Sequence, residues 1–168
     1  MPPVNNVTRF LDSHKVSYTV FETPAWKLGA QEVAELLNAP PETVFKTIVV
    51  RRDKPTLSPK GRKPVLAVVP GPSTVDLKSL AVFLGEKKIY LPTEREAEQL
   101  TGLQAGGISP LALINKGFQV VIDSSAHNYS EIHVSGGERG MNIKLPVADL
   151  VKLTNARIAS ICQNTDSF

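Results

Sequence analysis

The sequence predicts an α/β chain of the mixed α+β kind, with a curved mixed β-sheet or barrel-like core and flanking helices. Strand-like segments outnumber helical ones, and helices are interspersed among strands over the first two thirds of the chain. Three strand-like segments then follow one another, which favours a mixed or antiparallel sheet over a doubly wound parallel sheet. At 168 residues, with 42% hydrophobic and 21% charged residues, the chain is expected to form one domain over residues 1–168.

Five segments are predicted to be helical because their apolar residues recur at helical spacing. The first places Val7, Phe10 and Leu11 on one face. Thr93, with Glu96 three residues later, has the spacing of a capping box. Three of these helices are followed by a residue that commonly ends a helix: Asn38, Gly85 and Gly102. The predicted helices are 5–14, 30–37, 76–84, 93–102 and 147–153.

Seven segments are predicted to be strands from alternation or from their content of β-branched residues. Segment 43–50 is apolar on both faces, so we expect it to lie centrally in a sheet, with 65–69 as its partner. A further apolar segment, 158–161, follows the last predicted helix. The predicted strands are 16–21, 43–50, 65–69, 88–91, 118–122, 131–134 and 141–145.

Several classes of protein are excluded by composition. The longest nearly uncharged stretch, 101–115, contains three Gly and a Pro, so no membrane span or membrane partner is expected. The N-terminal residues lack a basic region followed by an apolar stretch, and Cys162 is the single cysteine, so a cytoplasmic location is expected. A metal cluster could be considered at His127, Glu131 and His133, but no third strong ligand stands at a recognised metal-binding spacing. We therefore expect ordinary surface residues there, and no metal.

Positive charge gathers in one segment that is expected to be a loop. The net charge of the chain is only +3, but residues 51–63 hold six basic residues and one acid, together with two prolines and a glycine, and Pro64 follows directly. Such a loop is a plausible contact for phosphates. It is equally compatible with a solvated hairpin loop that aids solubility.

Two further features could carry chemistry. Lys46 lies within the apolar segment 43–50, where an ammonium is costly unless it finds a partner, reaches solvent, or faces a water-filled cleft. Segments 101–110 and 134–140 are rich in glycine, and the first matches neither the dinucleotide fingerprint nor a P-loop. Adjacent glycines allow a backbone to approach a ligand closely. The second segment is also compatible with a simple glycine-rich hairpin.

Three motifs in this order resemble the YbaK/prolyl-tRNA-synthetase-associated domain family. They are Phe45-Lys46-Thr47-Ile48-Val49, the run from Thr101-Gly102 to Gly106-Gly107-Ile108-Ser109-Pro110-Leu111, and Val134-Ser135-Gly136-Gly137-x-Arg139-Gly140. The resemblance extends over nearly the whole chain. It implies a mixed β-barrel-like sheet with surrounding helices. It also implies a trans-editing enzyme that hydrolyses the ester joining a wrong amino acid to the 3′ end of tRNA.

The resemblance also implies roles for particular residues. It is strongest to the branch associated with Cys-tRNA(Pro), with Ala- or Ser-charged tRNA as alternatives, and in that branch the substrate's own thiol attacks. Catalysis is then expected from Lys46 as the essential lysine, from the Gly106 carbonyl and from Ser135 as a pocket serine, without a cofactor. The expected substrate contacts are Thr23, Gly107, Ile108, Ser109, Gly136 and Arg139, and the expected tRNA phosphate contacts are Arg51, Arg52, Lys60 and Arg62.

The expected partner is the acceptor end of an aminoacyl-tRNA, with prolyl-tRNA synthetase as a candidate protein partner and no role for DNA. Two departures from the family pattern touch the expected pocket wall and bear on amino-acid specificity: Thr23 stands about where a Tyr is usual, and Ala112 begins a run that replaces Gly-Gln-Lys. The alternative function is a non-catalytic module that binds tRNA ends or nucleotides in a synthetase complex. Lys46 discriminates between the two, because only an editing enzyme would lose turnover when it is replaced.

Overall fold

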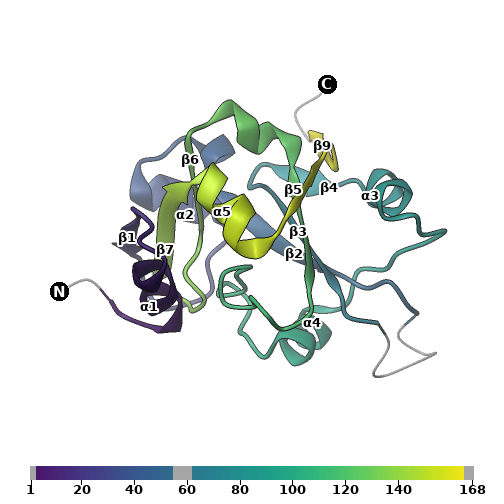
Figure 1. The fold of residues 1–168 in the computed structure, drawn as a ribbon, viewed down its shortest axis with the longest axis horizontal. Helices are drawn as coiled ribbons and strands as arrows, with labels where there is room; N and C mark the ends of the chain where they lie inside the picture. Colours follow the sequence, from purple (N-terminus) through teal and green to yellow (C-terminus); the bar gives the residue numbers. More distant parts are fainter. Residues whose placement is uncertain (1–2, 55–61, 165–168) are drawn as a thin grey trace.

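The computed structural model describes residues 3–54 and 62–164 (Figure 1). Its strands form a three-stranded sheet in the order β1-β7-β6, a four-stranded sheet in the order β2-β3-β5-β8, and a two-stranded sheet of β4 and β9. The predicted mixed α+β class is confirmed. Among the described strands, no sheet closes into a barrel.

The three-stranded sheet is antiparallel throughout and lies beside helix α1 (Asn6–Ser13). Its central strand is β7, which pairs with β1 on one side and with β6 on the other, so that Asn142 lies opposite both Phe21 and Ser135. The strand bounds are β1 (Thr19–Glu22), β6 (Glu131–Ser135) and β7 (Met141–Pro146).

The four-stranded sheet is mixed: β2 runs antiparallel to β3, whereas β5 runs parallel to both β3 and β8. The pairing of the segments around the basic loop is therefore confirmed. The central position expected for β2 is wrong, since β2 lies at the edge. It is apolar on both faces because both faces are covered, and Val44, just before it, bridges to His133 of β6. The bounds are β2 (Phe45–Val50), β3 (Val65–Pro70), β5 (Gln119–Asp123) and β8 (Arg157–Ala159).

Strand β3 separates two hydrophobic cores, and all six of its residues are buried. Leu66 and Val68 face the larger core, which also contains α1, the three-stranded sheet and helix α5 (Val147–Thr154). The alternate residues of β3 face a smaller core that is covered by helix α3 (Leu77–Leu84). The period of two in a strand thus assigns the residues of β2 and β3 to opposite sides of the sheet.

The helix boundaries agree closely with those predicted from capping residues. Helix α2 (Ala30–Leu37) ends at Asn38, which adopts a left-handed conformation with φ of 52°. Helix α4 (Glu94–Thr101) begins with the reciprocal hydrogen bonds of Thr93 and Glu96 and ends at Gly102. Short polar side chains at helix starts and left-handed residues at helix ends satisfy backbone groups that the helix leaves unpaired.

The structure differs from the prediction mainly in short elements. Segment 88–91 contains only a single bridge, between Tyr90 and Arg51, and β1 begins three residues later than expected. Five short elements were not predicted: the 3-10 helices Pro41–Thr43 and Ser124–Asn128, and the strands β4 (Ser73–Val75), β8, which overlaps the segment noted only as apolar, and β9 (Cys162–Asn164). A three-residue strand has too few residues to show a period, so only its distant partner identifies it. Within the described ranges, no helix combines the length and the apolar character needed to cross a bilayer.

Candidate active site

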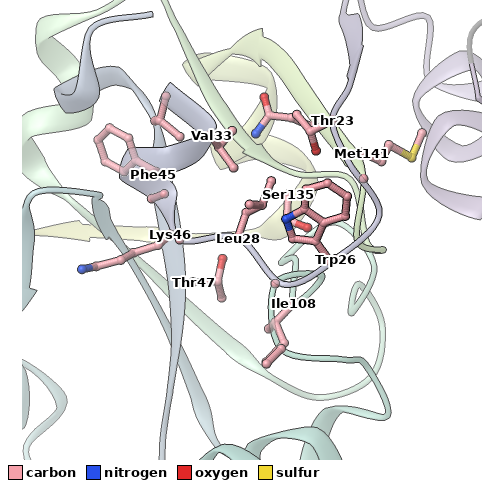
Figure 2. A pocket seen from close by; sticks show the side chains of 17 residues that line it. Thr23, Trp26, Leu28, Val33, Phe45, Lys46, Thr47, Ile108, Ser135 and Met141 are labelled. Atoms are coloured by element: carbon pink, nitrogen blue, oxygen red, sulfur yellow. The ribbon is translucent and has the colours of Figure 1, made fainter. Parts of the chain in front are cut away.

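A cavity of about 260 Å³ opens where the two larger sheets meet (Figure 2). Four separate parts of the chain line it: the segment between β1 and α2 with the start of α2, the beginning of β2, the first glycine-rich segment, and the hairpin of β6 and β7. The three residues expected to carry catalysis all reach this cavity. The lining residues include Thr23, Trp26, Lys46, Thr47, Gly106, Ile108, Ser135 and Asn142.

Lys46, the second residue of β2, lines the cavity but directs its ammonium away from the centre. Its Nζ donates a hydrogen bond to the main-chain oxygen of Gly71 at 3.0 Å. Figure 2 shows the side chain extending away from Thr47 and Ser135, as expected from the alternation of side chains along a strand. Half-burial lowers the pKa of Lys46 below its ordinary value, and the nearby Cys162 acts in the opposite direction.

A buried polar cluster lies beyond the Lys46 ammonium. Asp123 is 3% exposed, and its carboxylate accepts hydrogen bonds from the backbone N–H groups of Ile161 and Ser125 at 3.0 and 3.1 Å. Burial alone would raise the pKa of Asp123, but the hydrogen bond from the Ser125 hydroxyl, together with these two and one from Cys162, outweighs it and lowers that pKa. Burial, reinforced by Asp123, raises the pKa of Cys162 to about 11. The Cys162 thiol is therefore protonated at neutral pH, which makes it a poor nucleophile.

The two glycines of the first glycine-rich segment serve different purposes. Gly106 is exposed at the cavity and has a φ of +90°, a conformation that favours glycine. Gly107 is buried behind the cavity wall, where a Cβ would lie 2.9 Å from the Cα of Glu138. Its absent side chain therefore allows the two glycine-rich segments to pack together. Arg139 also holds the two segments together, because its Nε donates a hydrogen bond to the main-chain oxygen of Ala105 at 2.7 Å.

The second glycine-rich segment is the hairpin between β6 and β7, and it also contributes to the cavity. Ser135 ends β6, and its Oγ accepts a hydrogen bond from the N–H of Gly137 at 3.3 Å. Gly136 is buried, and its N–H donates to the Met141 oxygen at 2.9 Å. A Cβ at Gly136 would lie 2.6 Å from the Cγ of Met141, so this glycine permits the tight turn. This segment is therefore a glycine-rich hairpin and also part of the lining of the cavity.

His133 and Asn142 form a hydrogen-bonded pair beside the cavity, and of the two only Asn142 lines it. The Nδ1 of His133 lies 2.8 Å from the Oδ1 of Asn142, and the His133 side chain is almost completely buried. Burial holds the pKa of His133 below its ordinary value, so the ring is neutral at pH 7 and its Nδ1–H donates to Asn142. The Nδ2 amide group of Asn142, which lines the cavity, remains available as a donor to a ligand.

The expectation that His133 is a surface residue is wrong, whereas His127 is exposed. Over residues 3–54 and 62–164, no group of three or more metal-ligating side chains is close enough to hold an ion. His133 points away from the larger core, which holds its neighbours Ile132 and Val134; it is buried because Val44 bridges to it and its ring lies 5.4 Å from that of Phe21.

The residues expected to contact substrate divide into two groups. Thr23 and Ile108 line the cavity. Ser109 does not: it is completely buried, and its Oγ accepts a hydrogen bond from the Leu111 N–H at 3.1 Å, so it supports the turn beneath the cavity. The remaining three expected substrate contacts lie behind or beside the cavity wall: Gly107, Gly136 and Arg139.

The three arginines of the basic segment have carboxylate partners within the protein. Arg51 is only 8% exposed and lies 3.8 Å from Glu96. Arg62 lies 2.6 Å from Glu86 and 3.0 Å from Asp53. Arg52 also pairs with Glu86, at 3.8 Å, and donates a hydrogen bond to Gln119. Lys60 lies outside the described residues. A phosphate contact by these arginines would have to compete with the carboxylates already present.

Among the cavity residues that were not singled out from the sequence, three offer polar or stacking contacts to a ligand: Thr47, Asn142 and Trp26. Alternation along β2 and β7 could have indicated the first two, because Thr47 is two residues from Phe45 and Asn142 lies opposite Ser135. Trp26 had no such signal, since it lies in the irregular segment that joins β1 to α2. Its indole is 63% exposed. Figure 2 shows it beside Ser135 and above Ile108.

Comparison with known proteins gives a consistent result. A family model described as "Aminoacyl-tRNA editing domain" matches residues 25–153, which include Lys46, Gly106 and Ser135. The chain is 38% identical over 159 residues to EbsC of Enterococcus faecalis, a proposed Cys-tRNA(Pro)/Cys-tRNA(Cys) deacylase; the match covers 93% of this chain and 92% of EbsC. It is 25% identical to the prolyl-tRNA editing protein ProX of Acetoanaerobium sticklandii, over 87% of each chain.

A solved structure shares the fold. The crystal structure of a proposed trans-editing enzyme for prolyl-tRNA synthetase aligns with a TM-score of 0.75 at 24% sequence identity, over 96% of this chain and 99% of that one.

Proposed function

The chain belongs to the aminoacyl-tRNA editing domain family, and we propose that it hydrolyses the ester of mischarged aminoacyl-tRNA, with Cys-tRNA(Pro) as its substrate. The observation that carries the proposal is the meeting of Lys46, Gly106 and Ser135, from three distant parts of the chain, in one cavity. A cavity of about 260 Å³ is slightly smaller than typical ligand pockets. It suits a small amino acid and its ester.

The described site offers hydrogen-bond donors and acceptors for the ester end. After its hydrogen bond to Gly71, the Lys46 ammonium has two further N–H donors. Rotation of this flexible side chain toward the cavity centre would bring them to the ribose or to negative charge on the ester oxygen. The exposed main chain of Gly106 can accept a hydrogen bond from a ribose hydroxyl or from the substrate ammonium. The Asn142 amide adds a donor from the opposite wall.

Ser135 is better suited to positioning than to nucleophilic attack. Its Oγ receives a hydrogen bond from Gly137, and the histidine on the same strand, His133, is engaged with Asn142 instead. A serine nucleophile requires an adjacent base within hydrogen-bond reach. In Cys-tRNA(Pro), the substrate's thiol can attack its own carbonyl. A C–S bond forms, the C–O bond to the ribose breaks with a proton passing to the ribose oxygen, and water then opens the cyclic thioester.

Orientation accounts for most of what such a site must supply, because an aminoacyl ester is already reactive. An enzyme that holds the reacting groups in the correct geometry, so that they need not meet by diffusion, gains a large increase in rate. Amino-acid choice then depends on the wall where Thr23 lies, since its short side chain leaves more room than a tyrosine there would leave.

The experiment is a deacylation assay with Cys-, Ala- and Ser-charged tRNA(Pro), with correctly charged Pro-tRNA(Pro) as the control. We expect release of cysteine to be fastest and alanine to be released far more slowly, because alanine has no thiol. Equal rates for cysteine and alanine would overturn attack by the substrate thiol. Binding without hydrolysis of any of these tRNAs would overturn the enzymatic proposal and favour the non-catalytic binding module. A synthetase requirement is tested by adding prolyl-tRNA synthetase to the same reactions.

A further inference from the structure

We propose that Trp26 is the stacking surface for the terminal nucleobase of the tRNA acceptor end, immediately outside the cavity. This inference rests on the proposed function and adds a second subsite, for a purine base, to the subsite for the ester. A single exposed hydrophobic side chain needs no explanation in itself. Trp26 differs from the other large exposed hydrophobic residues of the described chain because it alone among them also lines the cavity. The others are Val4, Leu36, Val82 and Leu91.

The size of the cavity places the base outside it. At about 260 Å³, the cavity has room for a small amino acid and its ester but not for a whole nucleotide as well. The ester is carried by the same ribose as the terminal base, so the base can lie no further away than the breadth of one sugar. The mouth of the cavity is therefore the only region in reach, and the Trp26 indole is the aromatic surface there (Figure 2).

The segment that carries Trp26 is anchored on both sides of the ring. The N–H of Thr23 donates to the Gly140 oxygen at 3.0 Å. Lys27 pairs with Glu94 of α4 at 2.5 Å. Gly140 itself leaves room for this segment, because a Cβ there would lie 3.2 Å from the Cα of Ala25. A platform that is already held in place loses little conformational freedom when a base stacks on it.

The chemistry of the contact suits a terminal base. Every base has a π-face, so stacking on an aromatic side chain tolerates any sequence. The terminal nucleotide of the acceptor end is common to all tRNAs, so recognition there need not discriminate among them. Stacking would instead add affinity for the terminal nucleotide in the free and in the reacting complex alike, with the ester left to Lys46 and Gly106.

The first test uses the fluorescence of Trp26, which is the single tryptophan of the chain. Titration of the protein with an uncharged RNA minihelix that ends in the acceptor sequence should quench and shift its emission. A minihelix whose terminal nucleotide lacks its base should bind roughly 5- to 100-fold more weakly, as expected for one lost stacking contact. Equal affinity for the two minihelices would overturn the inference. This test requires no hydrolysis, so it remains informative if the proposed function fails.

The second test uses variants in the deacylation assay. Trp26→Ala should raise KM roughly 5- to 100-fold with little change in kcat at saturation, and Trp26→Phe should recover most of the loss. Val82→Ala, at an equally exposed position on α3, is the matched control and should leave both constants unchanged. Removal of the terminal base should not weaken binding to Trp26→Ala any further. A fall in kcat with unchanged KM, or additive losses from the variant and the missing base, would overturn the inference.

Discussion

Lys46 and Gly71 are joined by a hydrogen bond of 3.0 Å from the lysine Nζ to the glycine oxygen. The N–H of Gly71 in turn donates to the Val44 oxygen at 2.8 Å, so the turn after β3 is tied to the beginning of β2. A Cβ at Gly71 would lie only 2.8 Å from that of Ala30, at the start of α2. The position of the Lys46 ammonium thus depends on a close approach of α2 to this turn.

The first prediction concerns Lys46→Met. We expect deacylation to fall at least about 100-fold, the scale of a lost transition-state contact to a charged group. Burial lowers the pKa of Lys46, so its charged form is disfavoured by folding, and removing it relieves that cost. The Gly71 oxygen loses its partner, which costs about 1–3 kcal/mol. Because the two effects oppose each other, the Tm should change by only about 4 °C or less.

Two measurements check this balance. Lys78→Met, at an exposed lysine on α3, should change neither activity nor Tm. Any stability that Lys46→Met gains at pH 7 should shrink as the pH rises through the lowered pKa toward 10.5, because wild-type Lys46 then becomes neutral. Retained turnover together with a large fall in Tm would show that Lys46 has a structural role only.

The second prediction concerns Gly106→Phe. The side chain would project toward Lys27 and Arg139 at the cavity mouth, and should therefore block the acceptor end. Gly85→Phe is a matched control, because Gly85 also has positive φ and lies at the end of α3, with open space around it. Both variants should lose about 1–3 kcal/mol through backbone strain. Only Gly106→Phe should lose deacylation, and full activity in that folded variant would place the substrate elsewhere.

The third prediction concerns pH and His133. Burial lowers the pKa of His133, and the hydrogen bond to Asn142 raises it by a smaller amount. Of the nearby charges, Lys144 lowers this pKa and Glu131 raises it. The folded state therefore binds fewer protons than the unfolded state, and stability should fall as the pH drops below 6.5 toward the lowered pKa. His133→Gln should show a shallower loss of Tm between pH 7.5 and pH 5. His127→Gln, at an exposed histidine, should follow the wild-type curve; a wild-type Tm that is flat over this range would contradict the prediction.

The fourth prediction concerns the single cysteine. With a pKa of about 11, the Cys162 thiol is almost entirely protonated at pH 7.5, and alkylation by iodoacetamide should be at least about 100-fold slower than for an exposed thiol. Asp123→Asn removes a charge that raises this pKa and should speed labelling, whereas Asp149→Asn on α5 should not. Mass spectrometry gives the rates. Fast labelling of the folded wild type would contradict the partly buried, protonated state.

The fifth prediction concerns the arginines of the basic segment. If each contacted a phosphate, its neutralisation would lower the slope of log affinity against log salt by roughly 0.7 to 0.9. The ion pairs of Arg62 with Asp53 and Glu86 lead us to expect a smaller change for Arg62→Gln. tRNA binding measured between 50 and 200 mM salt distinguishes the two outcomes, with Arg9→Gln, on α1, as the control. A loss of roughly 0.7 to 0.9 in slope would restore the phosphate interpretation for Arg62.

The two errors in the prediction of β2 and His133 have a common cause. Segment 43–50 is apolar on both faces, as central strands are, yet it lies at a sheet edge. What covers that edge is β6, more than eighty residues later in the chain, through the bridge from Val44 to His133. The same contact buries His133. The pattern of apolar residues along a segment indicates which of its faces are covered, but it does not indicate which element of the fold covers them.

The sequence by itself determined the mixed class, the helix ends, the pairing of β2 with β3 and the three motifs that meet at the cavity, because capping, periodicity and glycine content are local properties. Only the tertiary structure decided which way Lys46 points, that Gly107 and Gly136 serve packing while Gly106 faces the cavity, and that Trp26 stands at its mouth. It also decided that the described arginines of the basic segment face carboxylates of the same chain. These outcomes depend on distances between residues far apart in sequence, and such distances arise only when the sheets and cores pack together.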